Sequence, residues 1–147
     1  MVTMRALRVL LLLAPAISAH FTLDYPPSFG FDEDKEPTAP CGGFNFQGQT
    51  TDFSLAATSG YVQVDSHHPS ATLQINAIPG LENVTATSTG LTLKTFSMTG
   101  LGTACLPVSV PSSAPLGNYT LQVIFNGPDG ILYQVSSSHA EMKSHRR

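Results

Sequence analysis

The residue with the clearest potential for chemistry is His20, because of where the chain is expected to be cut. Residues 1–8 hold two arginines and no acid, residues 9–16 are apolar but too short to span a bilayer, and residues 16–19 (AISA) suit signal peptidase. This pattern predicts a signal peptide over residues 1–19 and a secreted protein. Cleavage after Ala19 makes His20 the new amino terminus, whereas cleavage after Ser18, the alternative, does not.

An N-terminal histidine presents an α-amine and an imidazole Nδ1, which can close on one metal ion. A second histidine would complete a T-shaped set of three nitrogens, and Cu(II) is the divalent ion that such a set favours most. His67 and His68 lie in a polar loop between two expected strands, and Pro69 restricts the backbone of His68 to an extended conformation. The sequence therefore predicts a copper site, the alternative being that these histidines are ordinary surface residues.

The charge of the expected domain excludes several partners. Removal of residues 1–19 leaves 128 residues, enough for one domain with a real core. Residues 20–134 carry two lysines against nine carboxylates, so we expect no binding to nucleic acid or to anionic membranes. No second apolar run is long enough for a transmembrane segment.

The cysteines and two asparagines agree with secretion. Cys41 and Cys105 are the only cysteines, and an even number in a small secreted domain indicates a disulfide. Asn83 and Asn118 each begin an acceptor sequence for N-glycosylation. We therefore expect a disulfide-bonded glycoprotein.

Short alternating segments predict strands. Apolar and polar residues alternate over residues 61–65, 71–77 and 118–125, and residues 131–135 can return as a hairpin partner across the turn 126–130. Residues 91–96 and 106–110 are weaker candidates, whereas residues 25–46 are punctuated by proline and glycine and predict a loop. Several short strands with turns between them, and no helical period in the mature chain, indicate an all-β, antiparallel β-sandwich.

Other common catalytic patterns are absent. The sequence has no C-x-x-C, no H-E-x-x-H and no glycine-rich loop between a strand and a helix, so nothing favours zinc-peptidase or nucleotide chemistry. It also has no G-x-S-x-G motif of a serine hydrolase. The histidines remain the strongest candidates.

Six motifs, spread over most of the expected mature chain, carry a resemblance to a known family. They are residues 20–26 (HFTLDYP), 30–35 (GFDEDK), 40–44 (PCGGF), 68–71 (HPSA), 100–107 (GLGTACLP) and 125–134 (FNGPDGILYQ). In combination they resemble the fungal copper acquisition factor-like proteins, which are related to lytic polysaccharide monooxygenases.

The resemblance implies a fold, a metal and a pair of ligands. The fold would be an immunoglobulin-like β-sandwich, and the metal would be copper held by a histidine brace without polysaccharide oxidation. His20 takes the position of the brace residue, and His68 takes that of the second histidine because it directly precedes the proline. His67 is the alternative second ligand.

The chain departs from the resemblance after Gln134. The family typically continues with Cys-Ala-Asp, the aspartate being a further copper ligand, whereas Val135 and Ser137 stand here at the positions of the cysteine and the aspartate. The usual partner of Cys41 or Cys105 is therefore missing, and their mutual pairing becomes the fallback. We expect the domain to end at residue 134 and residues 135–147 to be an atypical, disordered tail.

Two functions from different classes follow. The first is a secreted copper(II)-binding protein, extracellular or associated with the cell wall or cell surface, that serves copper acquisition or homeostasis and passes copper to a cell-surface uptake protein. The second is a copper monooxygenase that cleaves polysaccharides oxidatively. Such enzymes commonly expose aromatic residues to sugars, and this sequence has no tryptophan and only four tyrosines, which favours the carrier.

Overall fold

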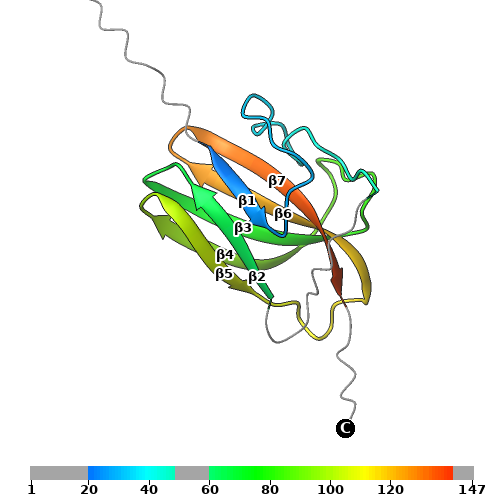
Figure 1. Ribbon diagram of the computed structural model, residues 1–147. Helices are drawn as coiled ribbons and strands as arrows, with labels where there is room; N and C mark the ends of the chain where they lie inside the picture. Colours follow the sequence, from blue (N-terminus) through cyan, green and yellow to red (C-terminus); the bar gives the residue numbers. More distant parts are fainter. Residues whose placement is uncertain (1–19, 49–59, 141–147) are drawn as a thin grey trace, which may run out of the picture.

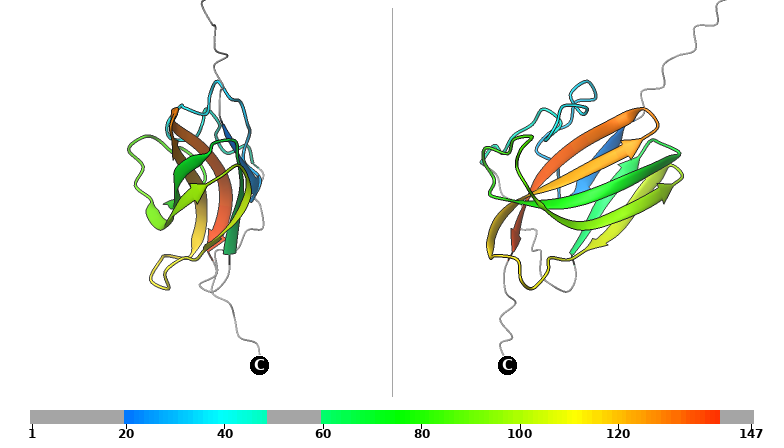
Figure 2. Two further views of the ribbon diagram at one scale, coloured as in Figure 1. Left: turned by 90° about the vertical axis from the view of Figure 1, so that its left-hand side faces the viewer. Right: turned by 180° about the vertical axis from the view of Figure 1, so that it is seen from behind.

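The computed structural model describes residues 20–48 and 60–140, and these form seven strands without a helix. The expected signal peptide lies outside the described residues. Figures 1 and 2 show two layers of strands packed face to face. The strands are β1 (Phe21–Tyr25), β2 (Gly60–Ser66), β3 (Ser70–Pro79), β4 (Leu91–Thr99), β5 (Gly102–Val108), β6 (Gly117–Gly127) and β7 (Gly130–Ala140).

The seven strands divide into two antiparallel sheets, which confirms the predicted all-β sandwich. One sheet has the order β1-β2-β5 and the other the order β4-β3-β6-β7. Within the described residues no helix is long and apolar enough to cross a membrane. The predicted hairpin is present, because β6 and β7 pair from Gly117↔Ala140 to Gly127↔Gly130.

The alternation of the strands builds the core between the sheets. Side chains that face inward are almost completely buried, and those on the opposite faces are more polar and more exposed. Each sheet contributes aliphatic and aromatic residues to one continuous cluster. Among its fully buried members are Phe21, Val62, Val64, Leu73, Ile75, Leu121, Val123 and Phe125.

Two strands differ from the sequence-based expectations. β1 was not assigned, and it forms because it pairs with β2 from Phe21↔Ser66 onward. β5 covers residues 102–108 and not 106–110, and it includes Pro107. A proline is tolerated there because β5 is an edge strand, whose outer amides need no partner in a sheet.

The expected disordered tail is wrong for residues 135–140, which complete β7. Residues 135–138 are at most 2% exposed, and their backbone pairs with residues 119–122 of β6. The Ser136 hydroxyl donates to the Pro27 carbonyl at 2.7 Å, and the Ser138 hydroxyl donates to the Tyr119 carbonyl at 3.2 Å. Serines with such partners can be buried in a strand although they show no apolar alternation. Residues 141–147 lie outside the described residues.

Candidate metal centre

The register of β1 and β2 brings His20 to His67, the first residue of the histidine pair. His20 directly precedes β1, His67 directly follows the end of β2 at Ser66, and Phe21 pairs with Ser66. Antiparallel pairing therefore sets His20 opposite His67, and the His67 amide donates to the His20 carbonyl at 3.0 Å. Residues 47 positions apart in the sequence meet at one end of the sandwich.

The His20 ring lies in a half-buried position without a hydrogen bond at one nitrogen. Its centroid is 4.3 Å from that of His67 and 5.5 Å from that of Phe31. Its Nδ1 atom is buried and makes no hydrogen bond, although the Glu33 Oε1 atom is 3.4 Å away. A buried polar atom without a hydrogen bond costs free energy. A metal ion bound to this nitrogen would supply the missing partner.

His68 is held more firmly than His67. Its side chain is 2% exposed and packs on Phe125 at a centroid distance of 5.2 Å, and its Nδ1 atom is 3.5 Å from the Asp129 Oδ2 atom. Its backbone amide is also fixed, because it donates a hydrogen bond to the Ser66 hydroxyl at 3.2 Å. Phe125 also stacks on Phe21 at 4.8 Å, so one ring supports both His68 and the start of β1.

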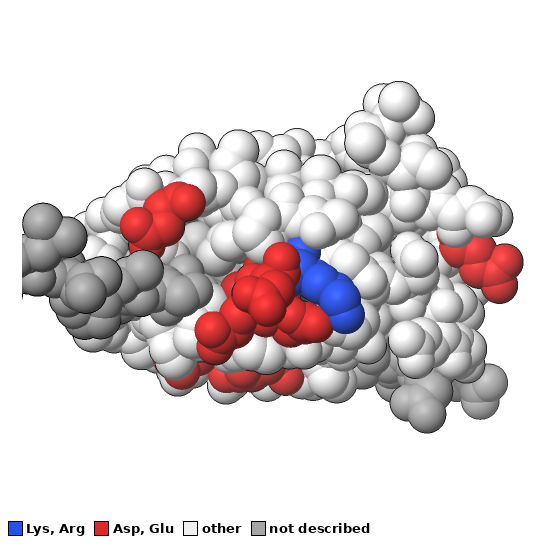
Figure 3. All heavy atoms as spheres, turned by 90° about the horizontal axis from the view of Figure 1, so that it is seen from above, with Lys and Arg blue, Asp and Glu red and all other residues white. Residues whose placement is uncertain are grey.

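The carboxylates that accompany these rings were not predicted from the sequence. Glu33 lies beside His20, Asp129 beside His68, and the Asp65 Oδ2 atom is 3.5 Å from the His67 Nε2 atom. Figure 3 shows acidic side chains gathered on the face that carries the long loop, with one small basic area beside them. The acidic run 32–34 was visible in the sequence, but its contact with His20 depends on the path of the loop.

Ser137, at the position of the expected aspartate ligand, lies away from the histidines along β7. Gln134 is the β7 residue that contacts β1, and Ser137 is three residues further on, a distance of about 10 Å along a strand. Ser137 pairs with Thr120 and is buried. Within residues 20–48 and 60–140, the carboxylates that approach His20, His67 and His68 to 3.5 Å or less are therefore Glu33, Asp65 and Asp129.

A buried polar network fixes β1 against the other sheet. The Leu23 amide donates to the Gln134 Oε1 atom at 2.9 Å, and the Gln134 Nε2 atom donates to the Phe21 carbonyl at 2.6 Å and to the Glu36 Oε1 atom at 2.7 Å. The Tyr133 amide donates to the Glu36 carbonyl at 2.9 Å. One amide side chain thus joins the edges of both sheets immediately after His20.

Glu36 is the acid of this network and is 2% exposed. Burial raises its pKa from 4.5 to about 7, and the negative charge of Glu33 acts in the same direction, whereas the hydrogen bond from Gln134 lowers it. Its Oε2 atom makes no hydrogen bond. Near neutral pH the folded protein therefore holds a partly protonated carboxyl group behind β1.

Glu36 should make the folded state less stable as the pH rises. The folded carboxyl keeps its proton up to about pH 7 and the unfolded one loses it near 4.5, so the stabilisation is complete below pH 4.5 and is lost as the pH rises through 7. Between pH 5 and pH 8 its contribution should fall by about 2 to 3 kcal/mol. Urea unfolding of wild type and Glu36→Gln at both pH values measures the difference, and equal pH dependence of the two proteins would refute this assignment.

The expected disulfide between Cys41 and Cys105 is not formed. Cys105 is exposed on the outer face of β5 in the three-stranded sheet, with its Sγ atom 3.9 Å from the Gln63 Oε1 atom. Cys41 is buried in the loop that covers the other sheet, where burial raises the pKa of its thiol to about 11. The sandwich separates the two thiols, and packed sheets alone are about 10 Å apart, which no disulfide spans.

Both asparagines of the glycosylation prediction are exposed. Asn83 lies in the loop between β3 and β4 with a positive φ of 59°. Asn118 lies at the start of β6, and its Oδ1 atom is 2.8 Å from the His139 Nδ1 atom. Glycosylation of either residue stays a prediction.

The donor atoms fit a histidine brace better than a site made of side chains alone. Within residues 20–48 and 60–140 no three His, Cys, Asp or Glu side chains converge as a metal site. A brace needs only two histidine side chains, since the α-amine supplies the third nitrogen. The buried His20 Nδ1 atom without a hydrogen bond and the constrained His68 are consistent with that set.

Comparison with known protein families and relatives points to copper. The family described as copper acquisition factor BIM1-like matches residues 18–136. The copper acquisition factor BIM1 of Cryptococcus neoformans var. grubii is 33% identical over 155 residues, covering 92% of this chain and 66% of that protein. An uncharacterised protein of Aspergillus fumigatus is 38% identical over 133 residues, covering 84% of this chain and 54% of that protein. The chain thus spans less than two thirds of the length of these relatives.

Solved structures show the same fold at low sequence identity. The catalytic domain of the lytic polysaccharide monooxygenase Lmo2467 from Listeria monocytogenes aligns with a TM-score of 0.60 at 14% identity, covering 83% of this chain and 99% of that one. A lytic polysaccharide monooxygenase from Jonesia denitrificans aligns with a TM-score of 0.54 at 15% identity, covering 83% and 100%. These likenesses establish the β-sandwich and say nothing of the reaction.

Proposed function

Since the chain belongs to the copper acquisition factor BIM1-like family, we propose that it is a secreted copper(II)-binding protein that serves copper acquisition or homeostasis. The observation that carries the proposal is the register of β1 and β2, which sets His20 against His67, the residue directly before His68, and leaves the His20 Nδ1 atom buried without a hydrogen bond. Removal of residues 1–19 would convert the His20 backbone nitrogen into a free α-amine, which is the third nitrogen of the set. Titration of the processed protein with Cu(II), expected to show one tight site, tests the proposal.

The residues near the site have different roles in this proposal. The His20 amine and Nδ1 atom bind copper together, and His68 supplies the third nitrogen through Nε2 because its Nδ1 atom faces Asp129. Acidic side chains around the site attract cations and repel anions. Copper is the ion that the protein would deliver, and we propose a cell-surface uptake protein as its recipient. The carrier itself would lie outside the cell or on its surface.

His68 is a better second ligand than His67 for a geometric reason. The His20 and His67 rings face each other at 4.3 Å with 35° between their planes, so their in-plane lone pairs do not point at one common atom. The His67 side chain is also 47% exposed, whereas that of His68 is buried and fixed. A fixed ligand loses less conformational entropy when the metal binds.

We expect His68→Ala to lower Cu(II) affinity by about 100-fold and His67→Ala by less than about 10-fold, because only the first removes a nitrogen ligand. The neighbouring histidine is the matched control, since both variants lose one imidazole from the same loop. Isothermal titration measures the affinities. If the larger loss follows His67→Ala, the second ligand is His67.

The monooxygenase alternative has support from one exposed ring beside His20, because Phe31 is 42% exposed. The absence of tryptophan argues against a broad sugar-stacking surface. We expect the copper-loaded protein to release no oxidised oligosaccharides from chitin or cellulose in the presence of a reductant. Mass spectrometry would detect such products, and finding them would establish the enzyme instead.

A further inference from the structure

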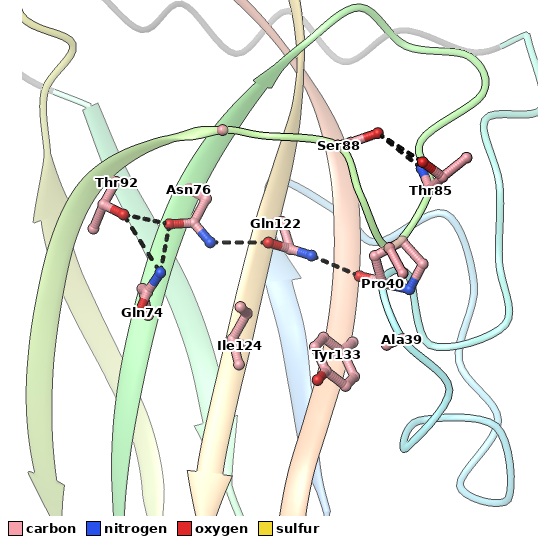
Figure 4. A pocket seen from close by; sticks show the side chains of 12 residues that line it. Ala39, Pro40, Gln74, Asn76, Thr85, Ser88, Thr92, Gln122, Ile124 and Tyr133 are labelled. Carbon is pink, nitrogen blue, oxygen red and sulfur yellow. Dashed lines mark hydrogen bonds between the residues drawn. The ribbon is translucent and has the colours of Figure 1, made fainter.

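A polar cleft lies on the outer face of the four-stranded sheet, on the side of that sheet opposite the core. Its volume is about 330 Å³, which falls in the range of small-molecule sites. Strands β3, β4, β6 and β7 form its floor, and segments 39–40 and 85–90 form its walls, as Figure 4 shows. The histidines lie elsewhere, at the end of the sandwich where β1 begins.

The chemistry of the lining is uniform. None of its twelve residues is charged, and most of the polar ones carry a carboxamide or a hydroxyl group. A cleft of this kind offers nothing to balance an ionised ligand, but it can exchange many hydrogen bonds with a neutral one. The polar lining residues are Gln74, Asn76, Thr85, Ser88, Thr92, Gln122 and Tyr133.

A row of hydrogen bonds fixes the polar floor. The Thr92 hydroxyl donates to the Asn76 Oδ1 atom at 3.0 Å, and Asn76 Nδ2 donates to the Gln122 Oε1 atom at 2.9 Å. Gln122 Nε2 then donates to the Pro40 carbonyl at 2.8 Å, and Gln74 Nε2 donates to Asn76 Oδ1 at 2.9 Å. The side chains are therefore preorganised before any ligand arrives.

The row does not use all of its hydrogen-bonding capacity. Asn76 and Gln122 are each 6% exposed, and each carboxamide nitrogen has two hydrogens but donates once, counted over the described residues. The Gln122 Oε1 atom accepts one bond and has a second lone pair. Among the described residues, one N–H donor on Asn76, one on Gln122 and one lone pair of the Gln122 Oε1 atom are thus left along the floor, and a hydroxyl group, which both donates and accepts, can pair with either kind.

Apolar groups stand beside this row. Figure 4 shows the Tyr133 ring and the Ile124 side chain on the same face as Gln122, with the Pro40 ring at the wall. A sugar ring presents hydroxyl groups around its edge and C–H groups on its faces, so it can contact both parts of the cleft. Few other classes of neutral metabolite carry as many hydroxyl groups as sugars do.

We propose that this cleft binds a neutral oligosaccharide through Gln74, Asn76, Gln122 and Tyr133. The binding is independent of copper, because none of the residues of the metal centre lines the cleft. A carrier with such a site would be held on a neutral glycan while its metal centre stays accessible at the end of the sandwich.

The test is an NMR titration of metal-free protein, produced in a host that attaches no N-glycans so that Asn83 does not carry a competing sugar. The probes are hexasaccharides of chitin, cellulose, β-1,3-glucan and mannan. We expect at least one of them to shift the side-chain amide signals of Gln74, Asn76 and Gln122. The identity of the active hexasaccharide names the source of the glycan.

Gln74→Ala should weaken this binding by about 5-fold, the loss expected for one hydrogen bond, without unfolding the protein, since Gln74 is only partly buried. Gln63→Ala is the matched control, being an amide on the outer face of β2 in the other sheet. The proposal is overturned if none of the four sugars shifts the cleft signals at millimolar concentration, or if the two variants bind equally. Neither result bears on copper binding.

Discussion

A protein with one extra residue before His20 should bind Cu(II) on the order of 1000-fold more weakly than the processed protein, a loss of about 4 kcal/mol. The added residue converts the α-amine, whose pKa is about 8, into an amide that does not give up its proton to a metal at neutral pH. It removes one nitrogen directly and opens the chelate ring that the amine forms with Nδ1.

The position of His20 before β1 allows the effect on the amine to be separated from any effect on the fold. The extra residue precedes β1, whose pairing with β2 begins at Phe21, so the sandwich itself should be unaffected. An extra residue at the C-terminus changes the length of the chain equally and leaves the amine free. Competition titration against a chelator of known affinity measures all three proteins, and equal Cu(II) affinity of the processed and N-terminally extended forms would exclude the brace.

Gln134→Leu should destabilise the protein by about 3 kcal/mol and lower its melting temperature by about 10 °C. The substitution keeps much of the side-chain volume but removes three buried hydrogen bonds. The Leu23 amide and the Phe21 carbonyl would then be buried without partners at the edge of β1. Thermal unfolding followed by circular dichroism measures the loss.

The same substitution should also weaken copper binding by about 10-fold, although the three hydrogen bonds of the Gln134 side chain go to neither His20 nor His68. It acts on His20 through the backbone of β1, which it bonds on both sides of Thr22. Gln63→Leu is the control, because that amide lies on an outer face and its hydrogen bond to Asp24 is exposed. Equal stability of the two variants would show that the network does not hold β1.

Much of the sandwich could be predicted because its central strands alternate strictly. In β3 and β6 every second residue is aliphatic or aromatic and faces the core, which a single sequence displays directly. The end of β7 could not be predicted, since residues 136–138 are all serine. Their burial depends on the carbonyl groups of Pro27 and Tyr119, which are distant in the sequence.

The candidate site was predictable only in part for the same reason. His20, His67 and His68 stand out by residue type and by their positions at a cleavage site and before a proline. The contacts of Glu36 with Gln134, 98 positions apart, leave no local pattern. Glu33 and Asp129 were visible as acids, but only the fold brings them to the histidines.

The electron paramagnetic resonance spectrum of the processed protein with one equivalent of Cu(II) tests the central claim most directly. We expect a tetragonal spectrum with hyperfine splitting from three nitrogens: the His20 amine, its Nδ1 atom and one further imidazole. The N-terminally extended protein should lose that pattern. A spectrum dominated by oxygen ligands, or one that is the same in both proteins, would contradict it.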